Sequence, residues 1–600
     1  MKNFSPSICV VFKVFVLVIF LSIFAPAYAK AAITMGELLE FIQENYGDIL
    51  SGENTFSTLQ RELLAKATPD EQYTKENGEV VPKVNQAYVW CLAKSGDDIW
   101  FGTAPNVLCL GLGSYFGITS PCETQSWACR FDGESPNGDW RPPHIYVYNT
   151  KTKTLIDKTP VDPRIMQTLG IRSAGTLGNI LLLAGPGSNG INLFAFNTET
   201  GAYLGSAQLE DYTNIRKWIV ANGVLYTAVG SSGGGGKVLR WAGSTKDLFV
   251  FEEVGNFLDG SGAELAFHEG RLFVSTWPNV LAGNSLPSYA GLYMSDVIPP
   301  GGLTGEHNDS WQKVWQATDY EPDPVTAATY GGGALASFDG YLYWGTMHVP
   351  FISAMIHFRQ YPYSPMKNPK AARMAILGTH RAISIFRGRN FANGDKKIDL
   401  LYGLPKLPVF TPGDDPSPGT WELSDNNMGG ALPLWGPPGF GNFFNNYTWS
   451  MSVYKNQLFV GTMDWSYLLI DSLEIIAGSI GFTALPDINP DALFNLTNHF
   501  FGADLFRFPS SDSFAVPEDI NGVGNYTNYG IRNMISDSKA LYLGMANPMN
   551  LLTDTTDDLP EGGWELIKLT EVPPAAAQQT NGDSDGRRHS RFCRDWTESE

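Results

Sequence analysis

The chain has 600 residues, 17% of them charged, and a formal net charge of −20 at pH 7. Such an acidic chain is a poor candidate for binding DNA, RNA or anionic lipid through bulk electrostatics, so no nucleic-acid partner is expected. It contains 63 glycines, and 13% of its residues are aromatic. Short aromatic segments bounded by glycine favour an all-β fold with many turns.

Residues 1–29 have the features of a secretory signal peptide. Lys2 precedes an apolar run that ends at Phe24, and residues 27–29 (A-Y-A) match the cleavage pattern. Lys13 interrupts the run, which leaves it too short to span a membrane comfortably. We therefore expect cleavage after residue 29, a secreted or periplasmic location, and no membrane span in the mature chain.

Residues 30–78 are predicted to form a small N-terminal helical segment, because apolar residues recur at helical spacing within 35–66. A short extended stretch, EVVPKV at 79–84, follows it.

The rest of the chain is dominated by a repeat. Seven apolar runs each end in a small residue, at Gly102, Ala184, Ala228, Ser275, Gly345, Gly461 and Gly544. Twelve residues before each stands what we name the opening position: Trp90, Arg172, Arg216, Ala263, Gly333, Trp449 and Arg532. A turn signal rich in Gly, Asn or Asp lies between the two positions, so each unit is predicted to begin with a β-hairpin.

Outer strands are expected after several of these hairpins, at 144–155, 191–204, 237–251, 381–403 and 562–569. Four-stranded units that repeat seven times are typical of a β-propeller. The predicted fold is all-β: a seven-bladed β-propeller over 79–572, with two long loop insertions at about 105–143 and 346–447. We expect 79–84 to close the ring by pairing with the last unit, because closure removes open sheet edges.

The pattern resembles the seven-bladed propellers of secreted and periplasmic proteins over about residues 80–570. The resemblance is architectural: the chain has no repeating W-D dipeptide, no kelch Gly-Gly signature and no sialidase Asp-box series. The polar tail at 573–600 is expected to be disordered.

Four cysteines lie within one short segment: Cys91, Cys109, Cys122 and Cys129. In an exported protein these are disulfide candidates, and the sequence leaves all three pairings open. A metal site has no support from a C-x-x-C motif or a nearby pair of histidines, so none is predicted.

The candidate ligand-binding residues come from the two loops of each unit that share one propeller face. They are Arg172, Arg216, Arg532, Trp277, Asn279, Trp449, Trp465 and Asn547. A ring of arginines can hold a carboxylate, sulfate or phosphate, and added aromatic and amide groups suit a sugar or another polar molecule. A structural role is the alternative, in which the arginines pair with acids or carbonyls and tie the blades together.

Candidate catalytic residues are His348, with Asp464 or Glu264 as its acidic partner. No hydrolase or nucleotide-binding motif accompanies them. Oxygen-rich segments at 487–494 and in the tail have Ca²⁺-like spacing without a complete loop, so no cofactor is predicted.

The sequence leaves three hypotheses for the function. The first is a secreted binding or interaction module whose channel face takes a small polar or anionic ligand, a glycan or an extracellular protein. The second is a propeller hydrolase or lyase that acts on an extracellular glycan or another polar substrate. The third is a structural surface protein with an inert channel.

Overall fold

The structure is a computed structural model, and it describes residues 58–116, 121–130, 139–257, 260–278, 288–361, 369–392, 394–413, 419–468, 501–553 and 561–572. The expected signal peptide, the segment 30–57 and the tail at 573–600 lie outside these residues. None of the described helices is long and apolar enough to cross a membrane.

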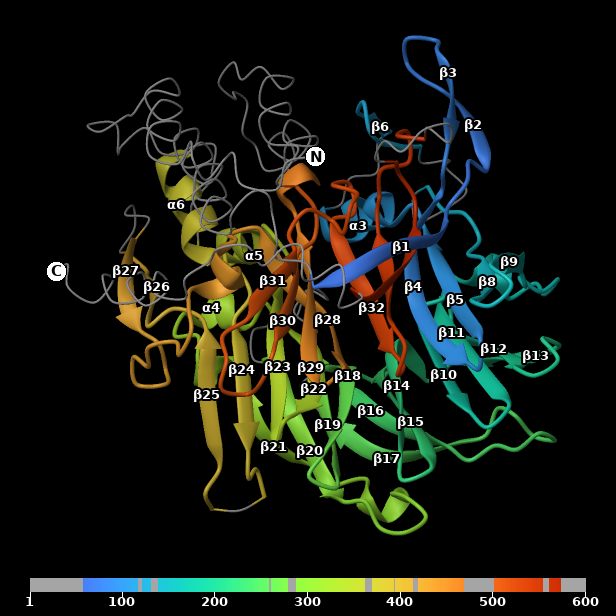
Figure 1. Cartoon of the computed structure of the whole chain (residues 1–600). Helices are drawn as coiled ribbons and strands as arrows, with labels where there is room; N and C mark the ends of the chain where they lie inside the picture. Colours follow the sequence, from blue (N-terminus) through green and yellow to red (C-terminus); the bar gives the residue numbers. More distant parts are fainter. Residues whose placement is uncertain are drawn as a thin grey trace.

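The described chain is mostly β and is built from antiparallel four-stranded units (Figure 1). The units of the first part of the chain are β4 (Gln86–Ser95), β5 (Asp98–Pro105), β8 (Ile145–Asn149) and β9 (Thr154–Asp157); β10 (Ser173–Leu177), β11 (Ile180–Gly187), β12 (Gly190–Asn197) and β13 (Tyr203–Leu209); and β14 (Tyr212–Ala221), β15 (Val224–Ser231), β16 (Gly236–Trp241) and β17 (Phe251–Phe257).

The units of the middle and last parts follow the same scheme. They are β18 (Ser261–His268), β19 (Arg271–Trp277), β20 (Gly291–Val297) and β21 (Gln312–Gln316); β22 (Tyr330–Phe338), β23 (Tyr341–His348), β24 (Ile385–Arg389) and β25 (Lys397–Tyr402); β28 (Asn445–Tyr454), β29 (Gln457–Asp464), β30 (Leu505–Phe508) and β31 (Val516–Asp519); and β32 (Gly530–Ser536), β33 (Leu541–Ala546), β34 (Glu565–Glu571) and β1 (Leu59–Lys66).

The first strands of neighbouring units pack against each other in a ring. They follow the order β4, β10, β14, β18, β22, β28 and β32, and β32 packs against β4 again. Each of these strands forms a hairpin with the next strand along the chain, as the repeat predicts. This arrangement is consistent with a β-propeller architecture.

The ring closes through an unexpected segment. Strand β1 pairs in antiparallel register with β34, from Leu59 opposite Glu571 to Lys66 opposite Glu565, so the N-terminal strand lies among the C-terminal ones (Figure 1). The prediction of a helix was therefore wrong over 59–66, and the prediction that 79–84 pairs with the last unit was also wrong. Residues 80–83 form β3 (Val80–Lys83), which pairs with β2 (Glu71–Thr74). A segment with leucines at helical spacing can also form an edge strand. Where a sheet edge is available for pairing, the strand is favoured over the helix.

A recurring threonine links the second strand of several units to the start of the third. In the runs FGT, VST, WGT and VGT, the Thr Oγ1 accepts a backbone N–H from the residue that begins or precedes the third strand. The four pairs are Thr103 with His144 at 2.8 Å, Thr276 with Gly291 at 2.9 Å, Thr346 with Ser384 at 2.9 Å, and Thr462 with Asp504 at 3.0 Å. Because the Thr side chains are buried, this repeated part of the sequence pattern serves the fold.

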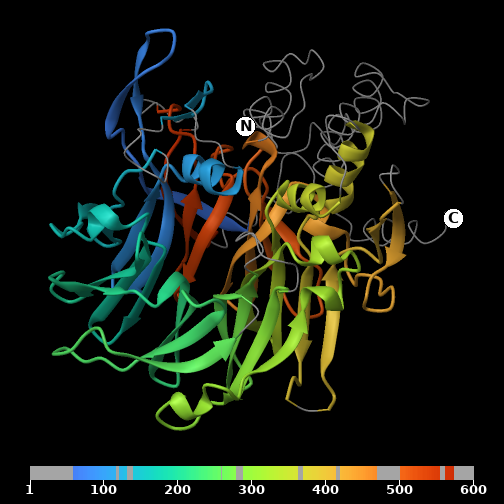
Figure 2. The ribbon, with the colours of Figure 1, turned by 180° about the vertical axis from the view of Figure 1, so that it is seen from behind.

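The insertions contribute helices that lie at one end of the strands. These are α3 (Val107–Phe116), α5 (Ile352–Gln360) and α6 (Pro369–Thr379), and both views place them at the same end (Figures 1 and 2). The second insertion also holds the hairpin of β26 (Lys406–Thr411) and β27 (Thr420–Asp425). The outer-strand pair expected at 381–403 is present as β24 and β25.

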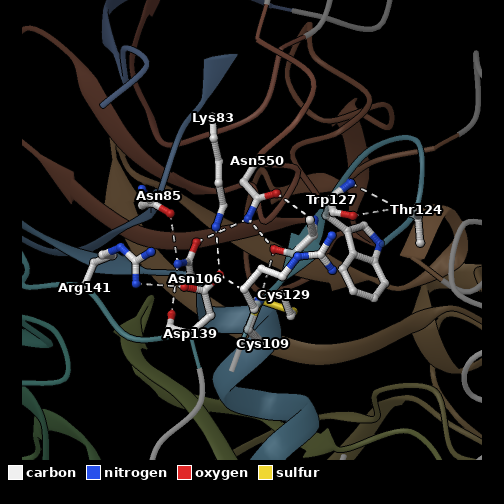
Figure 3. The surroundings of a disulfide bond; sticks show 12 residues. Lys83, Asn85, Asn106, Cys109, Thr124, Trp127, Cys129, Asp139, Arg141 and Asn550 are labelled. Atoms are coloured by element: carbon white, nitrogen blue, oxygen red, sulfur yellow. Dashed lines mark hydrogen bonds and ion pairs between the residues drawn. A yellow bond between two sulfur atoms is a disulfide. The ribbon is translucent and has the colours of Figure 1, made fainter. Parts of the chain in front are cut away.

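One disulfide, Cys109–Cys129, joins α3 to β7 (Ala128–Cys129). A buried polar network adjoins it (Figure 3): Lys83 Nζ lies 2.7 Å from Asp139 Oδ2, and Asn550 Nδ2 donates to the carbonyl of Ala128 at 3.1 Å. The disulfide ties α3 to β7, and the Asn550 contact ties β7 to the loop that follows β33 (Leu541–Ala546).

The two other cysteines of this segment are free. Cys122 stands directly opposite Cys129 in the short β6–β7 ladder, where β6 is Cys122–Glu123. Cys91 is buried inside β4, and its Sγ accepts the backbone N–H of Gly102 at 3.2 Å. Cys91 and Cys122 were therefore wrong as disulfide candidates. The Cys91 side chain lies in the core between two units, against Ile171, and Cys129, the neighbour of Cys122, is already bonded to Cys109.

Candidate functional site

The opening positions of the repeat lie at irregularities in the first strands. The strand register shifts around Trp90, Arg216, Ala263, Gly333, Trp449 and Arg532, and Arg172 directly precedes β10. A β-bulge leaves its extra residue unpaired and redirects that side chain. The repeated bulge explains how polar and aromatic side chains reach the region enclosed by the first strands, which we name the ring centre.

Three arginines at the ring centre each stack on a tryptophan from another unit. The distance from the guanidinium carbon to the centroid of the indole ring is 5.1 Å for Arg172 over Trp90, 4.9 Å for Arg216 over Trp277, and 5.7 Å for Arg532 over Trp449. The structure therefore pairs five of the predicted ligand-binding residues, together with Trp90, as arginine–tryptophan stacks. Cation–π contact in a dry environment stabilises the guanidinium charge.

Arg216 and Glu264 form a buried ion pair. The distance from Arg216 Nε to Glu264 Oε1 is 3.7 Å, and each residue is only 5% exposed. Arg216 Nη2 also donates to Met347 Sδ at 3.8 Å. Met347 belongs to a unit that is not adjacent to that of Arg216, so the Arg216 side chain reaches across the ring centre.

Arg532 lies in the same region, and none of the described carboxylates forms an ion pair with it. It is 3% exposed, and its Nη2 has no hydrogen-bond partner in the described part of the chain. Burial, and then the neighbouring charge of Arg216, lower the pKa of Arg532 to about 10, and Glu264 partly opposes this shift. The two cations therefore interact although they come from units that are not neighbours.

The other ionisable groups near Arg532 favour their neutral forms. Burial raises the pKa of the Cys91 thiol to about 12, and burial also raises the pKa of the Tyr529 phenol. Neither group supplies a negative charge at neutral pH.

An aromatic cluster connects Trp449, which stacks on Arg532, to the helices. Tyr88, Tyr447, Trp449 and Tyr529 pack together with side chains from α3, including Leu112. The hydroxyls of Tyr88 and Tyr529 are hydrogen-bonded to each other. Arg172, by contrast, is only half-buried, and its Nη1 donates to Asn214 Oδ1 at 2.5 Å.

The remaining candidate ligand-binding residues have separate surroundings. Trp465 is half-buried and packs on Tyr529, with ring centroids 6.2 Å apart. Asn547 is buried, and its Nδ2 donates to the carbonyl of Glu561 at 2.7 Å and to Thr527 Oγ1 at 2.8 Å. Asn279 lies outside the described residues.

The three candidate catalytic residues lie in three different networks. His348 is buried, and its Nε2 is within hydrogen-bonding distance of Ser353 Oγ (2.9 Å) and Thr329 Oγ1 (3.0 Å). Burial lowers the pKa of His348 well below its usual value, so the imidazole is neutral at neutral pH. Asp464 is also buried, and its Oδ2 accepts from Asn442 Nδ2 at 2.6 Å, whereas Glu264 pairs with Arg216.

A metal centre is not evident in the described ranges, where no group of three or more His, Cys, Asp or Glu side chains is placed to hold an ion. The Ca²⁺-like segment at 487–494 lies outside those ranges.

No protein-family model matches the chain, and no curated protein matches it. Among solved structures, the chain is similar to an α-L-arabinofuranosidase from Clostridium thermocellum, at 11% identity and a TM-score of 0.26 over 52% of this chain and 92% of that one. It is similar to Trypanosoma rangeli sialidase, at 10% identity and a TM-score of 0.31 over 68% and 56% of the two chains. It is also similar to the β-propeller domain of the Trilobed protease from Pyrococcus furiosus, at 9% identity and a TM-score of 0.24 over 58% and 86%.

Proposed function

We propose that the protein is a seven-bladed β-propeller that is exported and acts as a binding module through its channel face. The cyclic order of the first strands and the pairing of β1 with β34 support a closed ring of seven blades. The signal-like N-terminus supports export. The ring centre is then the channel of the propeller, where such folds commonly bind ligands.

The buried group of Arg216, Arg532 and Glu264 is the observation that supports binding. Charged side chains are almost never fully buried unless they are paired, and no carboxylate of the described ranges forms an ion pair with Arg532. Tryptophans on Arg216 and Arg532 add flat apolar surfaces next to the cationic groups. A set of this kind suits a small polar or anionic ligand.

The hydrolase or lyase alternative has less support. Its three candidate residues are all buried and lie in different hydrogen-bond networks, whereas acid–base catalysis requires groups within reach of one substrate. The inert structural protein remains the outcome to exclude by experiment.

Thermal unfolding of the exported chain tests the proposal. We would measure Tm against neutral oligosaccharides, sugar acids, simple organic acids, phosphate and Ca²⁺, for the wild type and for Arg172→Ala. Arg172 is the half-buried arginine at the ring centre, so its loss should weaken binding and leave the core intact. The matched control is Arg240→Ala, on the outer strand β16, where the Arg240 Nη1 donates to the carbonyl of Leu303 at 2.8 Å.

We expect a ligand-dependent rise in Tm in the wild type and in the control, and a smaller rise in Arg172→Ala, because binding to the native state stabilises it. If no compound raises Tm and Arg172→Ala is less stable in every buffer, the arginines serve the structure alone and the proposal is wrong.

A further inference from the structure

The described residues leave an uncompensated positive charge at the ring centre. Arg216 and Arg532 are both buried, and they interact with each other across the ring. Of the carboxylates in the described ranges, Glu264 pairs with Arg216, and its Oε1 lies 3.7 Å from Arg216 Nε. Among the fully buried groups of the described chain, two guanidinium groups and one carboxylate leave one positive charge. The third arginine, Arg172, is half-buried, so water and salt screen its charge.

Within the described part of the chain, the neighbouring groups do not balance this charge. Among the described residues, the charges of Arg216 and Glu264 shift the pKa of Arg532 most, followed by Cys91 and Tyr529. The thiol and the phenol are both protonated at neutral pH, for the reason given above. A buried charge is costly unless it is paired.

Donors of this pair also lack acceptors. Among the residues that the structure describes, neither Arg532 Nη2 nor Arg216 Nε has a hydrogen-bond partner, although both atoms are buried. Buried N–H groups in native proteins are almost always hydrogen-bonded to protein, water or a ligand. The missing acceptor and the missing negative charge thus occur at the same place.

We infer that a single monovalent anion, of the size of chloride or a small monocarboxylate, binds at the ring centre between Arg216 and Arg532. This inference rests on the proposed binding function and specifies its ligand class. One negative charge completes the balance, whereas sulfate or hydrogen phosphate would reverse it. The aromatic cluster around Trp449 and the low exposure of both arginines favour a small ion that can be fully desolvated.

The surroundings favour an anion over a water molecule. Arg216 lies on Trp277 and beside Met347, and Arg532 lies on Trp449. These neighbours offer few acceptors to the guanidinium groups, so an anion gains charge-assisted hydrogen bonds from both of them.

The first test compares anions at constant ionic strength. The Tm of the full chain would be measured in sodium sulfate and then with added chloride, bromide, formate or acetate. For a folded domain of about 500 residues, an anion at about a hundred times its Kd should raise Tm by about 2–3 °C. Halides acting alone identify a halide site, and formate or acetate acting more strongly identify a carboxylate site.

Arg532→Met should abolish this anion dependence, because the remaining Arg216–Glu264 pair is neutral. The matched control is Arg387→Met, another buried arginine that stacks on an aromatic ring. Arg387 has its own carboxylate, with Nε 2.9 Å from Asp399 Oδ2, and lies on β24 away from the ring centre. The control should lower Tm in all salts and keep the anion dependence.

A crystal of the wild type grown with bromide gives a second measurement, which does not depend on a variant that folds. If the site binds a halide, we expect an anomalous peak between Arg216 and Arg532. If it binds a carboxylate, we expect ordered carboxylate density there in a crystal grown with formate. An empty site together with an anion-independent Tm would overturn the inference. If a neutral sugar nevertheless raised the Tm of the wild type, the proposed binding function would stand and only the inference of an anion site would be wrong.

Discussion

Strand β1 is expected to close the ring, and a single core substitution can measure its contribution. Leu59 is 8% exposed and packs among Ile567, Leu569 and other core side chains of the last units. Truncation of a buried leucine to alanine typically costs 2–5 kcal/mol, so we expect Leu59→Ala to lower the free energy of unfolding by about 3 kcal/mol.

The corresponding change in Tm is small because the domain is large. With an unfolding entropy of about 2.1 cal/mol/K per residue and about 500 folded residues, 3 kcal/mol lowers Tm by about 3 °C. Differential scanning calorimetry would measure this shift, and hydrogen exchange at β34 amides would show whether the closing pair opens locally first.

Val80→Ala is the matched control, since Val80 lies in the segment that the sequence alone favours as the closing strand. Val80 is 62% exposed in β3, so its truncation should change the free energy of unfolding by less than about 0.5 kcal/mol. An unchanged Tm in Leu59→Ala combined with a lower Tm in Val80→Ala would refute closure by β1.

Three further substitutions address the covalent, ionic and protonation features of the fold. Cys109→Ser removes a disulfide with a sequence separation of 20, which should lower the free energy of unfolding by about 3 kcal/mol. After oxidation of this variant, peptide mapping should find Cys122 joined to Cys129, its partner across the ladder. Lys83→Met removes a buried cation from Asp139 and should cost about 3 kcal/mol in urea unfolding. Burial lowers the pKa of His380 to about 4, below its unfolded value of about 6.5. Between these two pH values the unfolded state binds more protons, so the free energy of unfolding falls as the pH falls. His380→Gln should reduce this fall by about 3 kcal/mol, measured by unfolding at a series of pH values.

Each of these expectations has its own control. Cys122→Ser should keep the native Cys109–Cys129 disulfide, and oxidation should not change its free energy of unfolding. Lys153→Met removes an exposed lysine, 2.9 Å from Glu62, and should cost under about 1 kcal/mol; an equal cost for both lysine variants would contradict the argument from burial. Burial raises the pKa of Asp519 to about 6, which opposes the histidine effect in the same window, so the wild-type and His380→Gln curves must be compared directly. Identical pH slopes would show that His380 is not responsible.

Several features of the fold could be predicted because they depend on neighbours along the chain. Alternating apolar residues, a turn signal and a small closing residue are enough to define a hairpin, and Gly102 and Gly461 indeed end runs that pair within hairpins. The outer strands β24 and β25 were also recognised inside an insertion, because a turn between two apolar runs is a local signal.

The closing strand could not be predicted in the same way. LQRELLAK at 59–66 contains strong helix formers, and only the open edge of β34, some 500 residues later in the chain, makes a strand the better choice. The identity of the disulfide depends likewise on whether Cys91 faces a core or a loop, which is a property of the whole sheet.

The sequence by itself determined the repeating hairpins and the position of Arg172, Arg216 and Arg532 within them, because both follow from spacing along the chain. Only the tertiary structure decided which charges meet. Glu264 comes to face Arg216, while Arg532 stacks on a tryptophan and forms no ion pair with a carboxylate of the described chain. The physical reason is that the balance of charge at the ring centre depends on residues from units that are distant in sequence, and no local pattern records which of them come together.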